Sequence, residues 1–141
     1  MVLGVVCEYN PFHRGHLYQL EESRRAAGED SVLICAMSGD FVQRGEAAVY
    51  SKFARAEAAV ACGADLVVEL PLPWCLSSAE GFARGGVGLL GALGVERLCF
   101  GSETGETEPL EELARLVTEP EFLDAVKNRL AADATLSLTV R

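Results

Sequence analysis

The feature that most constrains the fold of this chain is the alternation of short apolar runs with segments of helical periodicity. Four runs of six or seven residues, rich in Val, Leu, Ile and Cys, cover residues 2–7, 31–37, 65–70 and 95–100. Runs that are apolar throughout are typical of strands buried on both faces of a parallel sheet. Since helical segments separate them, the sequence predicts an α/β fold: a Rossmann-like parallel sheet with helices on both faces.

The helical segments can be placed from their periodicity and their end signals. Over residues 15–27, Leu17 and Leu20 share one side while charged residues occupy the other, and Gly28 ends the pattern. Further helices are expected over residues 52–62, 78–92, 109–117 and 121–131, and Ser78 is a suitable N-cap. Loops are expected over residues 38–49, 71–77 and 101–108.

Composition limits the domain organisation and the class of protein. A chain of 141 residues, half of them apolar, can bury one compact core. We expect one domain over residues 1–132 and interpret residues 133–141 as the start of a downstream segment. The five cysteines contain no Cys-x-x-Cys pair, which favours free thiols and no metal site. The N-terminus lacks a signal peptide pattern and no apolar run is long enough to span a membrane, so a cytoplasmic protein without a membrane partner is expected.

The charge is strongly acidic and unevenly distributed. The formal net charge is −9, and residues 64–141 hold six basic and thirteen acidic groups. Such a chain has no general attraction for nucleic acid, so DNA is not an expected partner. Any contact with RNA needs a local basic patch in the first half or a part of the protein outside this sequence.

The strongest functional signal is the stretch Asn10-Pro-Phe-His-Arg-Gly-His16, which follows the first apolar run and opens the first expected helix. Ligands of open parallel sheets bind beyond the carboxyl ends of the strands. A helix N-terminus there offers free N–H groups and the positive end of a dipole to phosphate. His13 and His16, the only histidines of the chain, can point to one side and stabilise charge on a pentavalent phosphorus. The alternative is an ordinary loop with one packed and one solvated histidine.

A second polar loop follows the second apolar run. It contains Arg44, and Lys52 and Arg55 come shortly after it, which favours contact with substrate or phosphate. The alternative is a solvated loop in which Arg44 and Glu46 stabilise each other. Trp74 is better explained as a core anchor than as a surface for stacking a base.

Five blocks of sequence carry a resemblance to a known family. They are Glu8-Tyr-Asn-Pro-Phe-His-Arg-Gly-His-Leu-Tyr18, Met37-Ser-Gly-Asp-Phe-Val-Gln-Arg-Gly-Glu46, Asp65-Leu-Val-Val-Glu-Leu-Pro71, Ser78-Ala-Glu-Gly-Phe-Ala83 and Phe100-Gly-Ser-Glu103. His-x-Gly-His after a first strand is similar to the signature of the HxGH nucleotidyltransferases. The five blocks in this order resemble the N-terminal part of the tRNA(Met) cytidine acetate ligase family. Asp40 and Ala47 depart from it, because the family commonly has Asn and Pro there.

The resemblance implies a function. ATP would activate acetate as acetyl-adenylate, and the acetyl group would pass to the wobble cytidine of elongator tRNA(Met), giving N4-acetylcytidine. The expected partners are therefore ATP, acetate and elongator tRNA(Met), and Mg²⁺ is expected to accompany the triphosphate without a dedicated protein site. Family members are longer, so the chain would be their N-terminal catalytic domain or a truncated form. Two alternatives stay open: an adenylyl- or cytidylyltransferase for a small metabolite phosphate, and a non-catalytic nucleotide-binding module.

The resemblance also implies which residues form the site. The catalytic residues would be His13 and His16. The ATP-binding residues would be Cys7, Glu8, Tyr9, Asn10, Pro11, Phe12, His13, Arg14, Gly15, His16, Leu17, Tyr18, Gln19, Leu20 and Gly101. Further possible contacts with substrate or phosphate are Ser38, Gly39, Asp40, Arg44, Lys52, Ser102 and Arg141. Arg141 is included because, with Ser137 and Thr139, it resembles a Ser/Thr-plus-Arg phosphate motif of HxGH enzymes.

Overall fold

A computed structural model describes residues 1–132 of the chain. The chain divides into two compact units, Met1–Gly101 and Ser102–Arg141, and the second is described as far as Ala132. The predicted domain boundary after residue 132, and the interpretation of residues 133–141 as a downstream segment, lie outside the described residues and stay predictions.

The first unit is built on a four-stranded parallel sheet with the strand order β3-β2-β1-β4. The strands are β1 (Val2–Cys7), β2 (Val32–Ser38), β3 (Leu66–Leu70) and β4 (Arg97–Leu98). Strands β1 and β2 lie side by side over their whole length, with Val2 opposite Val32 and Cys7 opposite Met37. The predicted parallel α/β sheet is confirmed, because the apolar runs form the strands.

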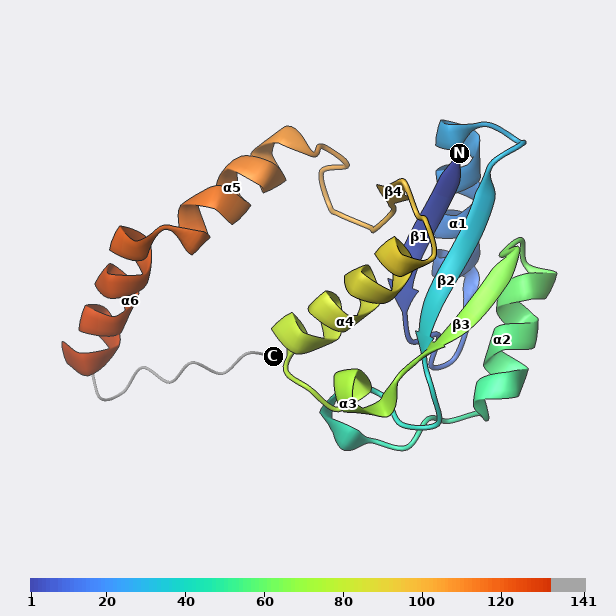
Figure 1. Cartoon of the computed structure of the whole chain (residues 1–141), viewed down its shortest axis with the longest axis horizontal. Helices are drawn as coiled ribbons and strands as arrows, with labels where there is room; N and C mark the ends of the chain where they lie inside the picture. The colour runs from blue at the N-terminus through green and yellow to red at the C-terminus, as the bar shows by residue number, and fades with distance from the viewer. Residues whose placement is uncertain (133–141) are drawn as a thin grey trace. The chain divides into compact units, whose positions relative to one another are not determined.

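Helices cover both faces of this sheet, as the sequence predicts. They are α1 (Arg14–Ala27), α2 (Lys52–Ala61), α3 (Leu72–Cys75) and α4 (Ala79–Ala92), with a short 3₁₀ turn η1 (Gln43–Gly45). On one face, Leu20 of α1 and Ala59 of α2 pack against alternate residues of β1 and β2. On the other face, Leu90 of α4 packs against Ile34 and Ala36. Figure 1 shows α4 and α1 on opposite sides of the strands.

Helix α4 lies unusually close to its neighbours, and two glycines make this possible. A Cβ atom on Gly86 would lie 2.6 Å from Cγ1 of Val6 in β1, and one on Gly85 would lie 2.4 Å from Cγ of Trp74. Both glycines are buried, although Gly lowers helix propensity. Trp74 packs on Gly85 of α4, but 40% of its surface is exposed and it belongs to neither core cluster, so it is a surface contact of α4 rather than the predicted core anchor.

Two predicted segments differ from the observed ones. The expected loop over residues 71–77 contains α3, because Pro71 and Pro73 fall at its N-cap and first turn, where proline is tolerated in a helix. The expected strand over residues 95–100 is reduced to β4, which pairs only with Leu3 and Gly4 of β1. Both residues of β4 are exposed at the edge of the sheet, so apolar character there does not indicate a long buried strand.

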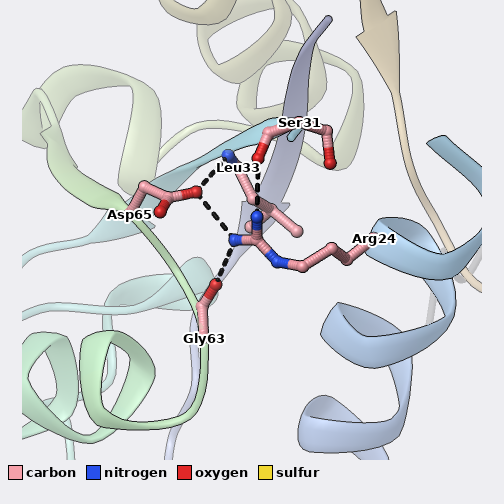
Figure 2. A network of polar contacts seen from close by, with 5 residues as sticks. All are labelled: Arg24, Ser31, Leu33, Gly63 and Asp65. Atoms are coloured by element: carbon pink, nitrogen blue, oxygen red, sulfur yellow. Dashed lines mark hydrogen bonds and ion pairs between the residues drawn. The ribbon is translucent and has the colours of Figure 1, made fainter. Parts of the chain in front are cut away.

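A polar network closes the end of the sheet where the strands begin (Figure 2). The Arg24 guanidinium donates to the carbonyls of Ser31 and Gly63 at 2.5 and 2.7 Å and to Oδ2 of Asp65 at 2.7 Å. The same Asp65 oxygen accepts the backbone N–H of Leu33 at 2.7 Å. Partial burial acts to raise the pKa of Asp65, but the Arg24 and Leu33 hydrogen bonds and the Arg24 charge outweigh it and lower that pKa. The network thereby joins α1 to the starts of β2 and β3.

The described part of the second unit consists of two helices, α5 (Glu108–Thr118) and α6 (Pro120–Ala132). These confirm the two helices predicted there. Leu113, Leu116 and Leu123 are among their exposed apolar side chains. Over residues 1–132, no helix has both the length and the apolar character that crossing a membrane requires.

Candidate functional site

A cavity of about 600 Å³ opens where β1 and β2 end, which is the edge of a parallel sheet where ligands are usually bound. The wall is formed by the end of β1, the loop that follows it, the first turns of α1, the turn around η1 and one residue of α4. The lining residues are Val6, Cys7, Glu8, Tyr9, Asn10, Pro11, His13, His16, Gln19, Val42, Gln43, Arg44, Glu46 and Phe82. Both histidines of the chain therefore lie at one cavity.

The side chains of the two histidines cap the backbone at the start of helix α1. His13 is the N-cap, and its Nδ1 accepts the N–H of Gly15 at 3.1 Å. Nδ1 of His16 accepts the N–H of His13 at 3.2 Å, which completes a reciprocal capping box. The helix therefore starts at Arg14, one residue before the predicted start.

These hydrogen bonds fix the tautomer of both rings. Because each Nδ1 is an acceptor, it carries no proton, and the ring hydrogen of a neutral imidazole must reside on Nε2. The rings stack with centroids 3.7 Å apart and planes inclined by 22°. Burial and the nearby His13 lower the pKa of His16, which favours its neutral form. His13 and His16 thus offer two Nε2–H donors that the capping box leaves free.

The residues that pack beneath the two histidines belong to the hydrophobic core and supply no reactive group. The Tyr9 ring lies 4.8 Å from that of His16, and its hydroxyl lies 3.4 Å from Sγ of Cys35 in the interior. Burial, reinforced by the two neighbouring thiols, raises the pKa of Tyr9 far above its ordinary value. Burial likewise raises the pKa of the Cys7 thiol. Neither group is therefore available as an anion near neutral pH. The Phe12 ring packs on the rings of Tyr9 and His16.

The second wall of the cavity is a hairpin-like segment of residues 39–50, called here the 39–50 segment. Its two arms are joined by hydrogen bonds from Val42 N to Glu46 O and from Ala48 N to Asp40 O, both 2.9 Å. Arg44 stands at its tip with a left-handed backbone (φ 73°) and an exposed side chain. The tip of a short hairpin therefore places the Arg44 cation on the cavity wall.

Side chains of the β1–α1 loop hold the 39–50 segment in place. Oε1 of Glu8 accepts the N–H of Gln43 at 2.6 Å, and Oδ1 of Asn10 accepts the N–H of Val49 at 2.7 Å. The histidine loop and the 39–50 segment are consequently one hydrogen-bonded assembly.

The remaining candidates of the second loop do not line this cavity. Asp40 caps the start of α2 by accepting the N–H of Lys52 at 2.9 Å, a bond that an Asn side chain could make equally well. The Lys52 ammonium pairs with Glu69 at 2.7 Å, and this hydrogen bond raises the pKa of Lys52. Ser38 is buried and donates to Glu8 at 3.4 Å. Gly39 is also buried, so Arg44 alone among the expected substrate contacts on this loop reaches the cavity.

Arg55 has a different role from the contact with phosphate that the sequence suggests. Its side chain is buried, and its guanidinium donates to the carbonyls of Glu8 at 2.5 Å, of Tyr50 at 3.0 Å and of Gly39. It lies beneath the loops and is not among the cavity residues.

The structure brings together about half of the expected nucleotide-binding residues. Phe12, Arg14, Gly15, Leu17, Tyr18 and Leu20 do not line the cavity. Leu20 is in the core and Tyr18 is 63% exposed. Gly101 ends the first unit, and Ser102 begins the second, where its Oγ accepts the N–H of Gly105 at 2.9 Å. Arg141 lies outside the described residues.

Five residues of the cavity wall are not among the binding residues that the sequence predicts. They are Val6, Val42, Gln43, Glu46 and Phe82. Phe82 lies in the block Ser78–Ala83, and Val42, Gln43 and Glu46 lie in the block Met37–Glu46, so the resemblance of these two blocks is the signal that could have found them. Among residues 1–132 there is no group of three or more His, Cys, Asp or Glu side chains placed to hold a metal ion.

A parallel sheet, a histidine loop and a helix N-terminus at one cavity define a nucleotidyl-transfer type of protein. Comparison with known families agrees, since the model of the family described as HIGH Nucleotidyl Transferase matches residues 1–139. The chain belongs to the HIGH nucleotidyl transferase family.

Individual relatives point to one branch of this family. The chain is 54% identical over 122 residues to the tRNA(Met) cytidine acetate ligase of Acetivibrio thermocellus, covering 85% of this chain and 29% of that protein. It is 48% identical to the enzyme of the same name from Clostridium acetobutylicum, covering 92% of this chain and 33% of the relative. The crystal structure of Thermotoga maritima TmcAL bound with alpha-thio ATP matches with a TM-score of 0.85 and 44% identity, over 96% of this chain and 33% of that one. The chain thus spans about a third of the length of these relatives.

Proposed function

We propose that the protein containing this chain uses ATP to activate acetate and acetylates the wobble cytidine of elongator tRNA(Met). The observation that carries the proposal is the pair of free Nε2–H donors of His13 and His16, which lie at the start of α1 in one cavity with Arg44. The names of the relatives and the ATP analogue bound to the Thermotoga structure support it.

The chemistry proposed for this site needs alignment and charge stabilisation rather than a nucleophilic side chain. An acetate oxygen forms a bond to the α-phosphorus of ATP as the bond to the bridging oxygen breaks, so acetyl-adenylate forms and pyrophosphate leaves. The N4 amino group of cytidine then bonds to the acetyl carbon, AMP leaves, and the amine loses one proton to solvent. Acetate is already an anion near neutral pH, and the buried Cys7 thiol is not needed.

The described residues can supply what the first step requires. We propose that His13 and His16 donate from Nε2 to phosphate oxygens, and that the N-terminus of α1 adds the positive end of its dipole. We propose that Arg44 contacts the triphosphate, and that Gly101 and the cavity-lining residues of the stretch from Cys7 to Leu20 complete the nucleotide site. Charge stabilisation by such donors contributes about 2–4 kcal/mol each to a transition state.

A magnesium ion and a cellular location complete the proposal. Oε2 of Glu8, which takes no part in the hydrogen bonds that hold the 39–50 segment, is an oxygen at the cavity of the type that Mg²⁺ accepts. Any such ion would be held mainly by the phosphates, because Mg²⁺ in nucleotide sites usually combines one or two carboxylates with substrate oxygens and water. We propose a cytoplasmic location, which the tRNA substrate in the relatives' names supports.

The first test is calorimetric titration of the chain with ATP and with a non-hydrolysable analogue in the presence of magnesium. Binding is expected for the native chain and should be lost in the His13→Ala, His16→Ala double variant. Arg25→Ala is a matched control, since Arg25 is an exposed residue in the last turn of the same helix. Equal binding by the double variant would refute the site.

The second test is acetate-dependent exchange of pyrophosphate into ATP. Exchange that requires acetate supports acetate activation. Exchange driven by phosphorylated metabolites instead would show a nucleotidyltransferase of small metabolites. ATP binding without any exchange would make this chain a nucleotide-binding module that depends on the rest of a longer protein for chemistry.

A further inference from the structure

Arg55 is a buried cation that holds three separate pieces of backbone. Its side chain is 2% exposed, in the first turns of α2. One guanidinium nitrogen donates to the carbonyl of Glu8 where β1 ends, a second to Gly39 where β2 ends, and Nε to Tyr50. Gly39 and Tyr50 are the two ends of the 39–50 segment, and Glu8 is the base of the histidine loop. One side chain therefore joins both walls of the cavity at their bases.

The partners of Arg55 are carbonyls and not carboxylates. None of the five ion pairs among residues 1–132 involves Arg55. A buried charge is retained only where hydrogen bonds compensate its loss of hydration. Three donors in a rigid planar fork can meet three fixed carbonyls, which a lysine ammonium on a flexible stem does less well. This arrangement favours a role in fixing the relative position of the loops.

The geometry explains why that position matters at the tip of the 39–50 segment. Arg44 lies four residues from Asp40, or about 13 Å along an extended arm at ~3.3 Å per residue. A rotation of about 5° at the base would therefore move the tip by roughly 1 Å, and a misplacement of about 1 Å can reduce the rate of an enzyme about 100-fold. The clamp by Arg55 acts at this base.

We propose that Arg55 is a positioning residue that fixes the 39–50 segment against the histidine loop, so that Arg44 faces the same phosphate groups as His13 and His16. The proposal rests on the proposed function for the identity of the ligand. Arg55 itself does not contact the ligand and acts through Arg44.

A double-mutant cycle on ATP binding tests this role. The four proteins are the native chain, Arg44→Ala, Arg55→Lys and the combined variant, each first shown to be folded by circular dichroism and urea unfolding. We expect each single variant to weaken ATP binding about 10-fold. The combined variant is expected to bind as weakly as Arg44→Ala alone. Once Arg44 is removed from the tip, Arg55 no longer has a ligand-binding side chain to position.

A purely structural role gives a different pattern. If Arg55 only supported the fold, the two losses would multiply to about 100-fold, or Arg55→Lys would bind ATP within twofold of the native chain. Either result would overturn the proposal. If Arg55→Lys does not fold, Arg55→Gln replaces it in the same cycle, since its neutral amide can still donate to the carbonyls at the base of the segment. Multiplying losses there would count equally against the proposal.

A measurement without ligand separates this inference from the proposed function. Amide hydrogen exchange of the Arg55→Lys variant is expected to be at least 10-fold faster at Val42, Gly45 and Ala48, whose N–H groups are bonded within the 39–50 segment. Exchange in α5 and α6 should be unchanged. If the native chain fails to bind ATP but this local effect is present, the proposed function fails and the clamp stands. If exchange in the segment is unchanged, the clamp is wrong whatever the chain binds.

Discussion

Replacing Gly86 by Ala tests whether the close packing of α4 on β1 determines the stability of the first unit. The new Cβ would lie 2.6 and 2.7 Å from the two γ-carbons of Val6. Since carbon atoms pack at about 3.5–4.0 Å, helix and strand would have to separate by roughly 1 Å. Val6 is β-branched and lies on a central strand, so it cannot rotate away. Overpacking of this kind costs about 1–3 kcal/mol.

The same substitution at Gly88 is a matched control. Gly88 lies in the same helix, and a Cβ there meets no atom within 4 Å. Both changes gain the helix propensity of Ala over Gly, about 1 kcal/mol. We therefore expect Gly88→Ala to stabilise the chain by that amount, and Gly86→Ala to be less stable than Gly88→Ala by about 1–3 kcal/mol, with propensity cancelled in the comparison.

Urea unfolding followed by the fluorescence of Trp74 is the suitable assay. Trp74 is the single tryptophan of the chain, and it belongs to the unit that contains α4. The slope of the free energy of unfolding with urea should be the same for both variants, so the difference lies in the midpoint. Equal midpoints for Gly86→Ala and Gly88→Ala would refute the packing argument.

Three further predictions concern ionisable groups. His16→Ala should slow acetate-dependent pyrophosphate exchange in the full-length protein by about 30- to 1000-fold, equivalent to 2–4 kcal/mol, and unchanged exchange would contradict the assignment. The folded-state pKa of His16 is lowered, so its neutral form contributes stability above the ordinary histidine pKa, and this contribution is lost as pH falls through the lowered value. Urea unfolding at several pH values should show this loss of stability for the native chain and not for His16→Ala. The folded-state pKa of Asp65 is also lowered, so its stability contribution is present above the ordinary aspartate pKa and is lost as pH falls through the lower folded value. Asp65→Asn should show a smaller loss of stability on acidification, and an unchanged acid transition would argue against the Arg24 network.

A prediction about RNA follows from the charge distribution. Because residues 64–141 are strongly acidic, the chain alone should bind tRNA weakly, and any binding should fall steeply with salt. Tight binding that salt does not weaken, measured by filter binding between 50 and 200 mM salt, would show an RNA surface that the charge distribution does not indicate.

The sheet and the position of the histidines could be predicted because each depends on local sequence. The run of residues 2–7 follows Met1 directly and ends before the charged Glu8, and β1 has those limits. Three of the four strand predictions agree within a residue, whereas β4 is shorter because its exposure at the sheet edge depends on packing that the sequence does not reveal. The capping box could not be predicted, because histidine is not a usual capping residue.

The arrangement of the basic residues was harder to predict, because it depends on contacts between distant segments. Lys52 and Arg55 are separated by three positions, yet one pairs with Glu69 on β3 and the other enters the core. One sequence signal could have indicated the burial of Arg55. It lies four residues before Ala59, on the side of α2 that faces the sheet, and an arginine on an apolar helix face needs buried partners.

The use of His13 as a helix cap sets a limit on how stable this protein can become while it keeps its proposed function. Ser, Asp and Asn are better N-caps than most residues and need only a short oxygen-bearing side chain. His13→Ser is therefore expected to hold α1 at least as firmly, yet it would remove one of the two Nε2–H donors from the cavity. A search for thermostable variants would tend to select such changes, and activity would fall as the melting temperature rose. This trade-off is expected where a functional residue occupies a structural position that another residue fills better.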